Sequence, residues 1–387
     1  MNIQDKKIAI VGGGPGGLTL ARLLQLKGLN VCVYERDINK YARVQGSPLD
    51  LHTDSGMAAI IKADLLSEFK NNFLPKADRL KILDKQANIF FSDHETKVEE
   101  NFDSPHFRPE IDRGALRKIL LESLHPDTAV WDSHFLSMSK EGEGWLLHFK
   151  NRDAVYADVV IAADGANSKI RPYITDSKPF YSGITMLEGN IYDAKHTASK
   201  IAALLEGGKI MAFGKGQNIL MGQKGNGEIG FYASFKTHEN WAADSSLDFN
   251  NRTRVMEWFK ANYPEWHDGW YALFENATVP FIPRPIYCMP LDQHWEAQPN
   301  VTMLGDAAHV MPPFAGEGVN MAMRDALELS NMLTSPAYPT LQDAISAYDN
   351  SMCARASMAA KESLANGERM HSEHALETML QFFNGFS

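Results

Sequence analysis

The 387-residue chain has little cysteine, an excess of acid over base, and no long apolar run. Its cysteines, Cys32, Cys288 and Cys353, are far apart and form no CxxC pair, which excludes a zinc knuckle and a disulfide framework and favours a reducing cytoplasm. The net charge of −10 argues against nucleic acid as a partner. Because no stretch of about eighteen apolar residues occurs, we expect neither a transmembrane helix nor a membrane partner.

Recognisable hydrolytic and metal-binding patterns are also missing. No Ser/His/Asp set, HExxH sequence or paired-carboxylate site stands out, and the 13 histidines are scattered, so we assign no metal ligand. Hydrophobic residues make up 44% and charged residues 22% of the chain, which is ordinary for a globular enzyme. The length favours two sub-domains that share an interface.

The first 40 residues have the pattern of a βαβ unit. An apolar strand is expected over Lys7–Val11, a mostly buried helix over Pro15–Lys27, and a second strand over Asn30–Glu35. Gly28 fits the C′ position of the helix. The run before Gly12 is too short for a signal peptide.

Later segments alternate between apolar strands, a glycine-rich region and helices. The alternating pieces from about 180 to 290 indicate an antiparallel sheet, and the chain looks helical after Pro339. The other expected elements are a helix over Asp112–Leu124 with Asp112 as N-cap, strands over Asp158–Ala163 and Asn300–Leu304, and a helix starting near Gly318.

The first chemical motif is Gly12-x-Gly14-x-x-Gly17, between the first strand and helix. Gly12 permits a tight turn, Gly14 lets a pyrophosphate approach the backbone, and Gly17 lets helix and strand pack closely. Glu35 ends the next strand, where a carboxylate accepts hydrogen bonds from a ribose 2′-OH and repels a 2′-phosphate. The motif predicts a site for FAD or NAD rather than NADP; the alternatives are a plain tight turn and an exposed strand end.

Two further predicted strands are each followed by an aspartate. Asp164-Gly165 follows the strand Asp158–Ala163, where the alternative is an ordinary Asp-Gly turn. Asp306 follows the strand Asn300–Leu304 and is suited to accept hydrogen bonds from ribityl hydroxyls.

The segment from Asp306 to Asn320 continues with glycine and proline. Gly316 and Gly318 would let backbone approach a flat ring, and the following helix would direct its positive end at that ring. His309, in the same segment, is interpreted as a packed loop histidine rather than a catalyst.

Together, the order GxGxxG, Asp-Gly and Gly-Asp resembles the group A flavoprotein monooxygenases, relatives of para-hydroxybenzoate hydroxylase. The resemblance implies one non-covalent FAD, transient binding of NADPH, oxygen activated on the flavin, a small-molecule substrate and a monomer. The expected architecture is α/β: a Rossmann-like FAD-binding domain, an inserted antiparallel-sheet substrate domain and a C-terminal helix. Its expected parts are 1–70, 105–180 and 291–335 for FAD, 71–104 and 181–290 for substrate, and 340–387 for a bridging helix.

Within that family the chain looks closest to the tetracycline-inactivating monooxygenases. The similar segments are Tyr34–Asp37, Gly46–His52, Ser234–Thr237 and Gly305–Asn320. By this resemblance, the adenosine half of FAD would contact Glu35 and Arg36, the flavin side Asp50 and Arg113, and the ribityl chain Asp306. Pro313, Phe314 and Gly316 would form the floor of the substrate pocket.

The sequence departs from that subfamily where substrate polar groups should be recognised. Glu188, Lys209 and Gly230 stand where glutamine, arginine and histidine are expected, and Met211 is assigned to the same pocket. Glu188 would disfavour an anionic substrate unless Lys209 pairs with it. The alternative substrates are smaller aromatic compounds and other polyketides.

Several readings stay open. A flavin-dependent halogenase would normally show W-x-W-x-I-P, which is absent, and a non-catalytic flavin-binding module would not need the shaped segment before Asn320. The apolar spacing over Met370–Phe383 indicates core packing, with a cover over the substrate entrance as the alternative. Basic side chains that fit either a solvated face or, for Arg113, flavin contact are Arg108, Arg113, Arg117, Lys118 and Arg171.

Overall fold

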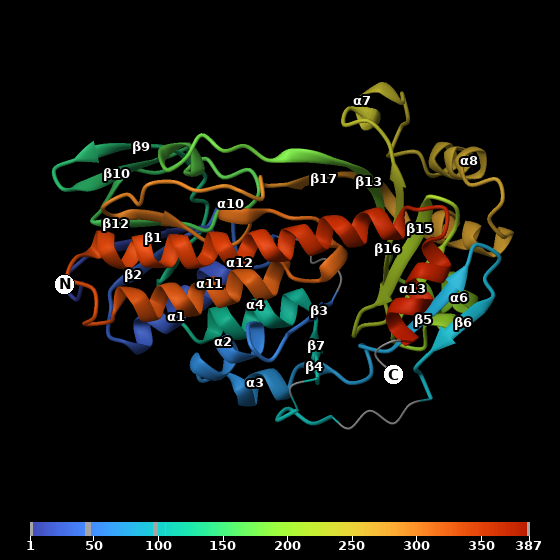
Figure 1. Cartoon of the computed structure of the whole chain (residues 1–387), viewed down its shortest axis with the longest axis horizontal. Coiled ribbons are helices and arrows are strands. Elements are labelled where there is room, and N and C mark those ends of the chain that lie inside the picture. The colour runs from blue at the N-terminus through green and yellow to red at the C-terminus, as the bar shows by residue number, and fades with distance from the viewer. Residues whose placement is uncertain (1–2, 43–47, 96–99, 105, 385–387) are drawn as a thin grey trace.

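A parallel five-stranded sheet forms one end of the protein (Figure 1). The computed structural model describes residues 3–42, 48–95, 100–104 and 106–384. The strand order is β18-β12-β1-β2-β8, and every neighbouring pair is parallel. The strands are β1 (Ile8–Val11), β2 (Val31–Tyr34), β8 (Ala129–Val130), β12 (Val159–Ala162) and β18 (Val301–Met303). The three apolar runs expected as strands near residues 8, 160 and 302 are therefore neighbours in one sheet.

Helices pack beside this sheet, and glycine allows their close approach. Helix α1 ends at Leu26, with Lys27 as its C-cap; Gly28 follows at C′, with φ of +76° and its N–H donating to Gln25 O at 2.9 Å, as expected. A Cβ at Gly16 would lie 3.0 Å from the carbonyl of Ala322, so α1 and α11 are in close contact. These helices are α1 (Pro15–Leu26), α2 (Gly56–Lys62), α3 (Leu66–Lys70), α4 (Arg113–Glu122) and α11 (Gly318–Leu333).

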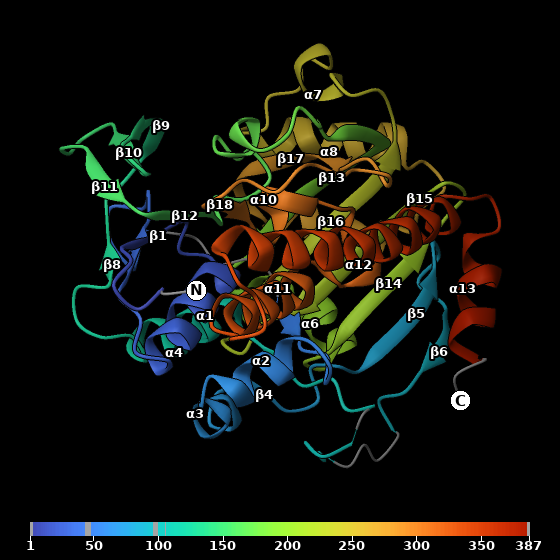
Figure 2. The same cartoon turned by 60° about the vertical axis from the view of Figure 1, so that its left-hand side comes forward.

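Two small sheets adjoin the parallel sheet. One is antiparallel and lies at the left in Figure 2, with strands β9 (Phe135–Glu141), β10 (Gly144–Phe149) and β11 (Val155–Ala157). The other has β7 between two partners, with strands β3 (Leu49–Asp50), β4 (Phe73–Leu74) and β7 (Glu110–Ile111). Pairing of β3 with β7 sets Asp50 directly opposite Glu110.

The second large sheet has seven strands in the order β17-β13-β16-β15-β14-β5-β6. All pairs are antiparallel, as expected for residues 180–290, except β14 with β5, which is parallel. Its strands are β5 (Leu80–Asp84), β6 (Ile89–Ser92), β13 (Phe180–Ile191), β14 (Lys209–Phe213), β15 (Gln217–Gln223), β16 (Ile229–Lys236) and β17 (Thr278–Cys288).

One face of this sheet is covered by helices and a large aromatic core. Phe231, Phe259 and Phe274 are fully buried there, with the Phe259 and Phe274 rings stacked 4.1 Å apart. The helices near this face are α5 (Ala194–Thr197), α6 (Ser199–Leu205), α7 (Trp241–Asp244), α8 (Arg252–Asn262) and α9 (Tyr271–Asn276). The opposite face is therefore the one available to a site.

The C-terminal region contains two helices rather than a single one. Helix α12 (Leu341–Met370) begins with a capping box made by Thr340 and Asp343 and runs from the parallel sheet to the seven-stranded sheet (Figures 1 and 2). The chain then turns, and α13 (Ala375–Asn384) packs against β5 and β14. Met370 and Met379 are buried in that contact, so the apolar spacing reflects core packing. No helix among the described residues has the length and apolarity needed to cross a bilayer.

Candidate cofactor and substrate site

The glycine loop after β1 is closed on one side and open on the other. A Cβ at Gly12 would lie 2.1 Å from the carbonyl oxygen of Ala163, and one at Gly17 would lie 2.2 Å from that of Gly12. A Cβ at Gly14 would meet no described atom within 4 Å. Gly12 also has φ of +114°, which L side chains rarely adopt. The loop therefore leaves a free approach at Gly14, beside the N-terminus of α1.

Glu35 lies against this loop at the end of β2. Its buried carboxylate accepts hydrogen bonds from the N–H of Gly13 at 2.6 Å and of Asp37 at 3.0 Å. Arg36, the other residue assigned to adenosine, is exposed. Glu35 is thus better placed than Arg36 to contact a ribose at the loop.

Arg117 is a site residue that the sequence analysis missed. Its guanidinium donates to Gly13 O at 3.4 Å and to the carboxylate of Asp37 at 3.1 Å, and stacks over Trp131. The assignment of Arg117 and Arg171 to a solvated face was wrong, because both are buried, whereas Arg108 and Lys118 are exposed. Arg117 lies beside Leu116 in the apolar stripe of α4, a signal that could have revealed it.

The Asp-Gly and Gly-Asp turns meet at one edge of the parallel sheet, because β12 and β18 are neighbours. Arg171 joins the turns: it donates to Ala307 O at 2.7 Å, to Asp306 O at 3.0 Å and to Ala166 O at 2.9 Å. Asp164 accepts from the N–H of Lys169 at 2.9 Å and so serves its own turn. Its other oxygen, Oδ1, is buried with no hydrogen-bond partner within the described chain.

Arg113 and Asp306 are surrounded by many protein atoms, yet both side chains are exposed to solvent. Burial lowers the pKa of the Arg113 guanidinium, although the charge of Asp306 acts against it. Burial raises the pKa of the Asp306 carboxyl, against the charges of His309 and Arg113. The two groups therefore share one electrostatic environment.

Asp112, expected to cap α4, instead accepts from the N–H of Gly225 at 3.2 Å.

A charged network links β3 to the start of α11. His52 Nε2 lies 3.1 Å from Asp50 Oδ2, and His52 Nδ1 lies 3.3 Å from Glu317 Oε1. Although burial acts in the opposite direction, hydrogen bonds that the His52 ring donates to both carboxylates raise its pKa to about 9. Burial likewise opposes the shift at Asp50, whose pKa falls to about 2 through its bond with His52 and the charge of Lys209. Asn320 completes the link by donating to Asp50 O at 3.0 Å. Gly46 and Ser47 of the same predicted segment lie outside the described residues.

The segment before α11 has backbone that other groups can approach closely. Gly316 is left-handed, with φ of +70°, and a Cβ there would lie 3.6 Å from Asp50 Oδ1. A Cβ at Gly318, the first residue of α11, would meet no described atom within 4 Å. Pro313 and Phe314 form a short 3₁₀ turn just before them. The helix thus begins at an approachable stretch of backbone.

A cavity of about 160 Å³ lies beside the Phe314 ring. It is lined mainly by apolar groups from β13, the Pro312–Phe314 segment and α12. The Phe314 ring lies 5.5 Å from the buried ring of His371. A Cβ at Gly367 would lie 2.8 Å from Phe314 Cδ2, so glycine at this position makes room for the ring.

Four of the seven predicted substrate contacts, Glu188, Lys209, Met211 and Gly230, share one face of the seven-stranded sheet. Strand register aligns Glu188, Tyr232, Leu220 and Met211 in one row across four strands. A second row, two residues along, contains Asn190, Gly230, Gly222 and Lys209. Met211, Leu220 and Phe314 pack against the same buried cluster, so this face and the segment before α11 border one core.

The charged side chains on this face of the seven-stranded sheet, called the wall below, have separate ion-pair partners. Glu188 accepts from Arg284 at 2.9 Å, whereas Lys209 pairs with the buried Glu110. The condition under which Lys209 would neutralise Glu188 is therefore not met, since the two are on different rows of the sheet and Arg284 pairs with Glu188 instead. Burial raises the pKa of Glu110 to about 7, even though Lys209 acts to lower it. Arg113 interacts electrostatically with Tyr232 and Glu188, which lie opposite each other on β16 and β13.

These features fit FAD. The open approach at Gly14 and the N-terminus of α1 suit a pyrophosphate, and the buried Glu35 carboxylate beside the loop suits a ribose. Asp306 suits the ribityl portion, and the half-buried Gly318, where a Cβ would meet no described atom within 4 Å, leaves room for the ring portion. No cluster of metal-binding side chains occurs within the described ranges.

Comparison with known proteins also indicates an FAD-binding protein. The family model described as "FAD binding domain" matches residues 5–213 and 292–362, which is most of the chain. A monooxygenase of Penicillium thymicola, penA, is 27% identical over 377 residues, 85% of each chain.

Solved structures show the same fold. HpxO of Klebsiella pneumoniae, in complex with FAD and uric acid, has a TM-score of 0.77 at 18% identity, over 99% of this chain and 93% of that one. Tetracycline destructase Tet(55) has a TM-score of 0.76 at 17% identity, over 100% and 96%. The chain therefore belongs to the FAD binding domain family.

Proposed function

We propose that the protein uses FAD, NADPH and O₂ to hydroxylate a polycyclic phenolic or enolic compound, with tetracyclines as the first candidates. The observation that carries this proposal is the wall opposite Phe314, where Lys209 and the Glu188–Arg284 pair flank an apolar strip that includes Met211. A substrate held there needs a flat apolar body and at least one anionic or hydrogen-bonding oxygen. Phenols and enols have both.

Bound FAD supplies the electron transfer and oxygen activation, and the protein supplies binding, orientation and exclusion of water. Asp306 would hold the ribityl hydroxyls, and Glu35 the ribose of the adenosine half. The N-terminus of α11 would direct its positive end at the flavin ring. NADPH would bind only transiently, because a carboxylate at the position of Glu35 repels a 2′-phosphate at the dinucleotide site.

The residues on the wall can orient an acidic oxygen of the substrate and handle its proton. Lys209 Nζ is a cation whose pKa is raised, because the charges of Glu110 and Asp50 outweigh burial. It can hold a phenolate or enolate oxygen by a charge-assisted hydrogen bond. Glu110 has a pKa of about 7, which suits it to take up, near neutral pH, the proton that the substrate hydroxyl loses.

The cavity beside Phe314 is large enough for one ring. Its volume of about 160 Å³ is close to that of an apolar cavity known to hold benzene, about 150 Å³. A fused ring system would place one ring there and extend its oxygens along the sheet toward Lys209. The smaller aromatic substrates that form the alternative would occupy the cavity without reaching that lysine.

Product analysis tests this function directly. Holoprotein is incubated with NADPH, O₂ and a panel of tetracyclines, other polyketides and simple phenols, and products are analysed by mass spectrometry. We expect a gain of one oxygen atom with a polycyclic member, together with NADPH oxidation above the rate without substrate. Oxygenation of simple phenols alone would favour the smaller-aromatic alternative. No oxygenated product from any member, with FAD bound and reducible, would contradict the proposal.

A further inference from the structure

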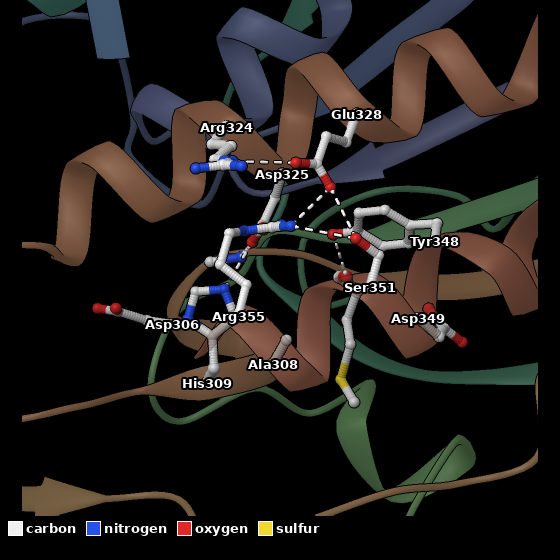
Figure 3. Close-up of polar contacts among 12 residues, drawn as sticks. Asp306, Ala308, His309, Arg324, Asp325, Glu328, Tyr348, Asp349, Ser351 and Arg355 are labelled. Carbon is white, nitrogen blue, oxygen red and sulfur yellow. Dashed lines mark hydrogen bonds and ion pairs between the residues drawn. The ribbon is translucent and has the colours of Figure 1, made fainter. Parts of the chain in front are cut away.

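A buried chain of alternating charges adjoins the Gly305–Asp306 turn (Figure 3). At its centre is Asp325 of α11. Its Oδ2 accepts from the N–H of Gly305 at 2.9 Å and lies 2.6 Å from His309 Nε2, while its Oδ1 accepts from Arg355 of α12 at 2.7 Å. The side chains of His309 and Asp325 are 2% and 0% exposed. Solvent therefore cannot screen this pair, and its geometry is tightly determined.

The network continues to the surface with the sign of the charge changing at each step. Arg355 also binds Glu328 at 2.6 Å, and Glu328 accepts from Arg324 at 3.0 Å. Arg324 is 35% exposed, so the chain of charges ends near solvent. The inner members are buried from solvent, so removal of one leaves its neighbour as an uncompensated buried charge.

Each member of the central pair shifts the pKa of the other in the direction that favours its charged form. Burial alone would lower the pKa of His309, but the charge and hydrogen bond of Asp325, together with the charge of Asp306, raise it. Burial alone would raise the pKa of Asp325, but His309 and Arg355 lower it. The charged groups that face His309 are thus Asp306 from its own segment and Asp325 from α11, with Arg355 behind Asp325 on α12.

The pair acts on a turn that only glycine can form. Gly305 has φ of +59° and ψ of −143°, and a Cβ there would lie 2.9 Å from that of Ala322. Asp325 holds the N–H of this residue, and Arg171 holds the carbonyl of Asp306. The turn is therefore fixed on both sides, while the carboxylate of Asp306 is directed away from the network (Figure 3).

We infer that His309 and Asp325 are positioning residues for the cofactor, which hold the Gly305–Asp306 turn so that the Asp306 carboxylate faces the ribityl chain of FAD. Arg355 anchors this pair to α12. None of the three needs to contact FAD. The inference rests on the proposed placement of Asp306 at the ribityl chain and does not depend on the substrate or on NADPH.

Asp325→Asn is the decisive variant, and Asp349→Asn is its matched control. Asp349 is also a buried carboxylate, on α12, but it accepts from Thr302 at 2.6 Å and Trp295 at 2.9 Å rather than from the turn. FAD dissociation constants are measured by titration of apoprotein, and melting temperatures are measured with and without FAD. We expect Asp325→Asn to weaken FAD binding about 10- to 100-fold, and Asp349→Asn by less than about threefold.

The ligand-induced shift separates positioning from general stability. Both variants should melt lower than the wild type, but only Asp325→Asn should lose most of the rise in melting temperature produced by FAD. Wild-type FAD affinity in folded Asp325→Asn, or an equal loss in Asp349→Asn, would overturn the inference. Asp306→Ala checks its premise: normal FAD affinity in that variant would show that Asp306 is not at the ribityl chain.

His309→Gln provides a second route if Asp325→Asn does not fold. Gln can place a donor near the position of Nε2 but carries no charge. Because the pKa of His309 is raised, wild-type FAD affinity should fall as pH rises above about 6.5 and through that raised pKa. The Gln variant should bind FAD more weakly at neutral pH and lack this fall. The same affinity and pH profile in both proteins would contradict a role for the charged pair.

Discussion

The guanidinium of Arg284 lies 2.9 Å from the carboxylate of Glu188, on the neighbouring strands β17 and β13. The negative charge that appeared to conflict with an anionic substrate is therefore compensated within the sheet. Arg284 is 53% exposed, so the pair contributes little to stability, about 0–1 kcal/mol. Its main effect is on the charge that a substrate meets at this wall.

Glu188→Gln should therefore change substrate preference rather than folding. Removal of the carboxylate leaves Arg284 as an unpaired cation, so kcat/KM for an anionic substrate should rise several-fold while that for a neutral analogue changes little. Glu257→Gln is the control, because Glu257 also pairs with an arginine, at 3.4 Å, but on the exposed surface of α8. Equal effects on both substrates, or a change of more than about 1 kcal/mol in unfolding free energy, would count against this account.

Glu35→Ala should weaken FAD binding and also destabilise the apoprotein. The buried carboxylate accepts from two backbone N–H groups, at Gly13 and Asp37, and its removal should cost about 1–3 kcal/mol. With FAD saturating, NADPH kinetics should remain broadly unchanged. Glu35→Gln, which keeps an acceptor oxygen, should retain more stability than the Ala variant. A raised KM for NADPH with normal FAD affinity would instead place NADPH at this loop.

His52 should make stability depend on pH in the alkaline range. Its folded-state pKa of about 9 lies above its ordinary value of 6.5, so its contribution is full below pH 6.5 and is lost as pH rises through about 9. The pKa of Asp50 is lowered from 3.8 to about 2, so its contribution is full above pH 3.8 and is lost as pH falls through about 2.

His52→Gln should therefore unfold more readily than the wild type by about 1–3 kcal/mol at pH 6, with a smaller difference at pH 9.5. Urea unfolding at several pH values measures this. His196→Gln is the control, since His196 also pairs with a carboxylate, at 2.6 Å, but is 75% exposed. If the unfolding free energies of wild type and His52→Gln depended on pH in the same way, the network would not be what holds the proton on the His52 ring.

The sequence predicted the parts of the fold that depend on local pattern. Glycine spacing and apolar runs located the turns at Gly12 and Gly305 and the strands that precede them, because backbone conformation and burial are encoded over a few residues. The break after Met370 was missed: the buried His371, which bonds to Ser234 at 2.7 Å, is a tertiary contact.

The side-chain partners in the site were less accessible to sequence reasoning. Lys209 meets Glu110 because β14 and β7 come together across about a hundred residues of chain, and nothing local specifies that contact. Asp325 is different. It lies four residues after Met321 and four before Leu329, an acid within the buried stripe of α11, which indicates a paired buried charge.

Gly367→Ala should impair the ring cavity while leaving the cofactor in place. The added Cβ would lie 2.8 Å from Phe314 Cδ2 and 3.2 Å from Ile184, so the Phe314 ring must move into the cavity of about 160 Å³. The gain of up to about 1 kcal/mol in helix propensity offsets part of the strain, so stability should change by less than about 1 kcal/mol. KM for a polycyclic substrate should rise by about three- to tenfold, while the FAD dissociation constant stays the same. Met358→Ala, on the same helix but 75% exposed, should alter neither quantity. Unchanged KM in Gly367→Ala would mean that the substrate does not use the cavity beside Phe314, and its rings would then have to lie along the Met211 strip of the sheet.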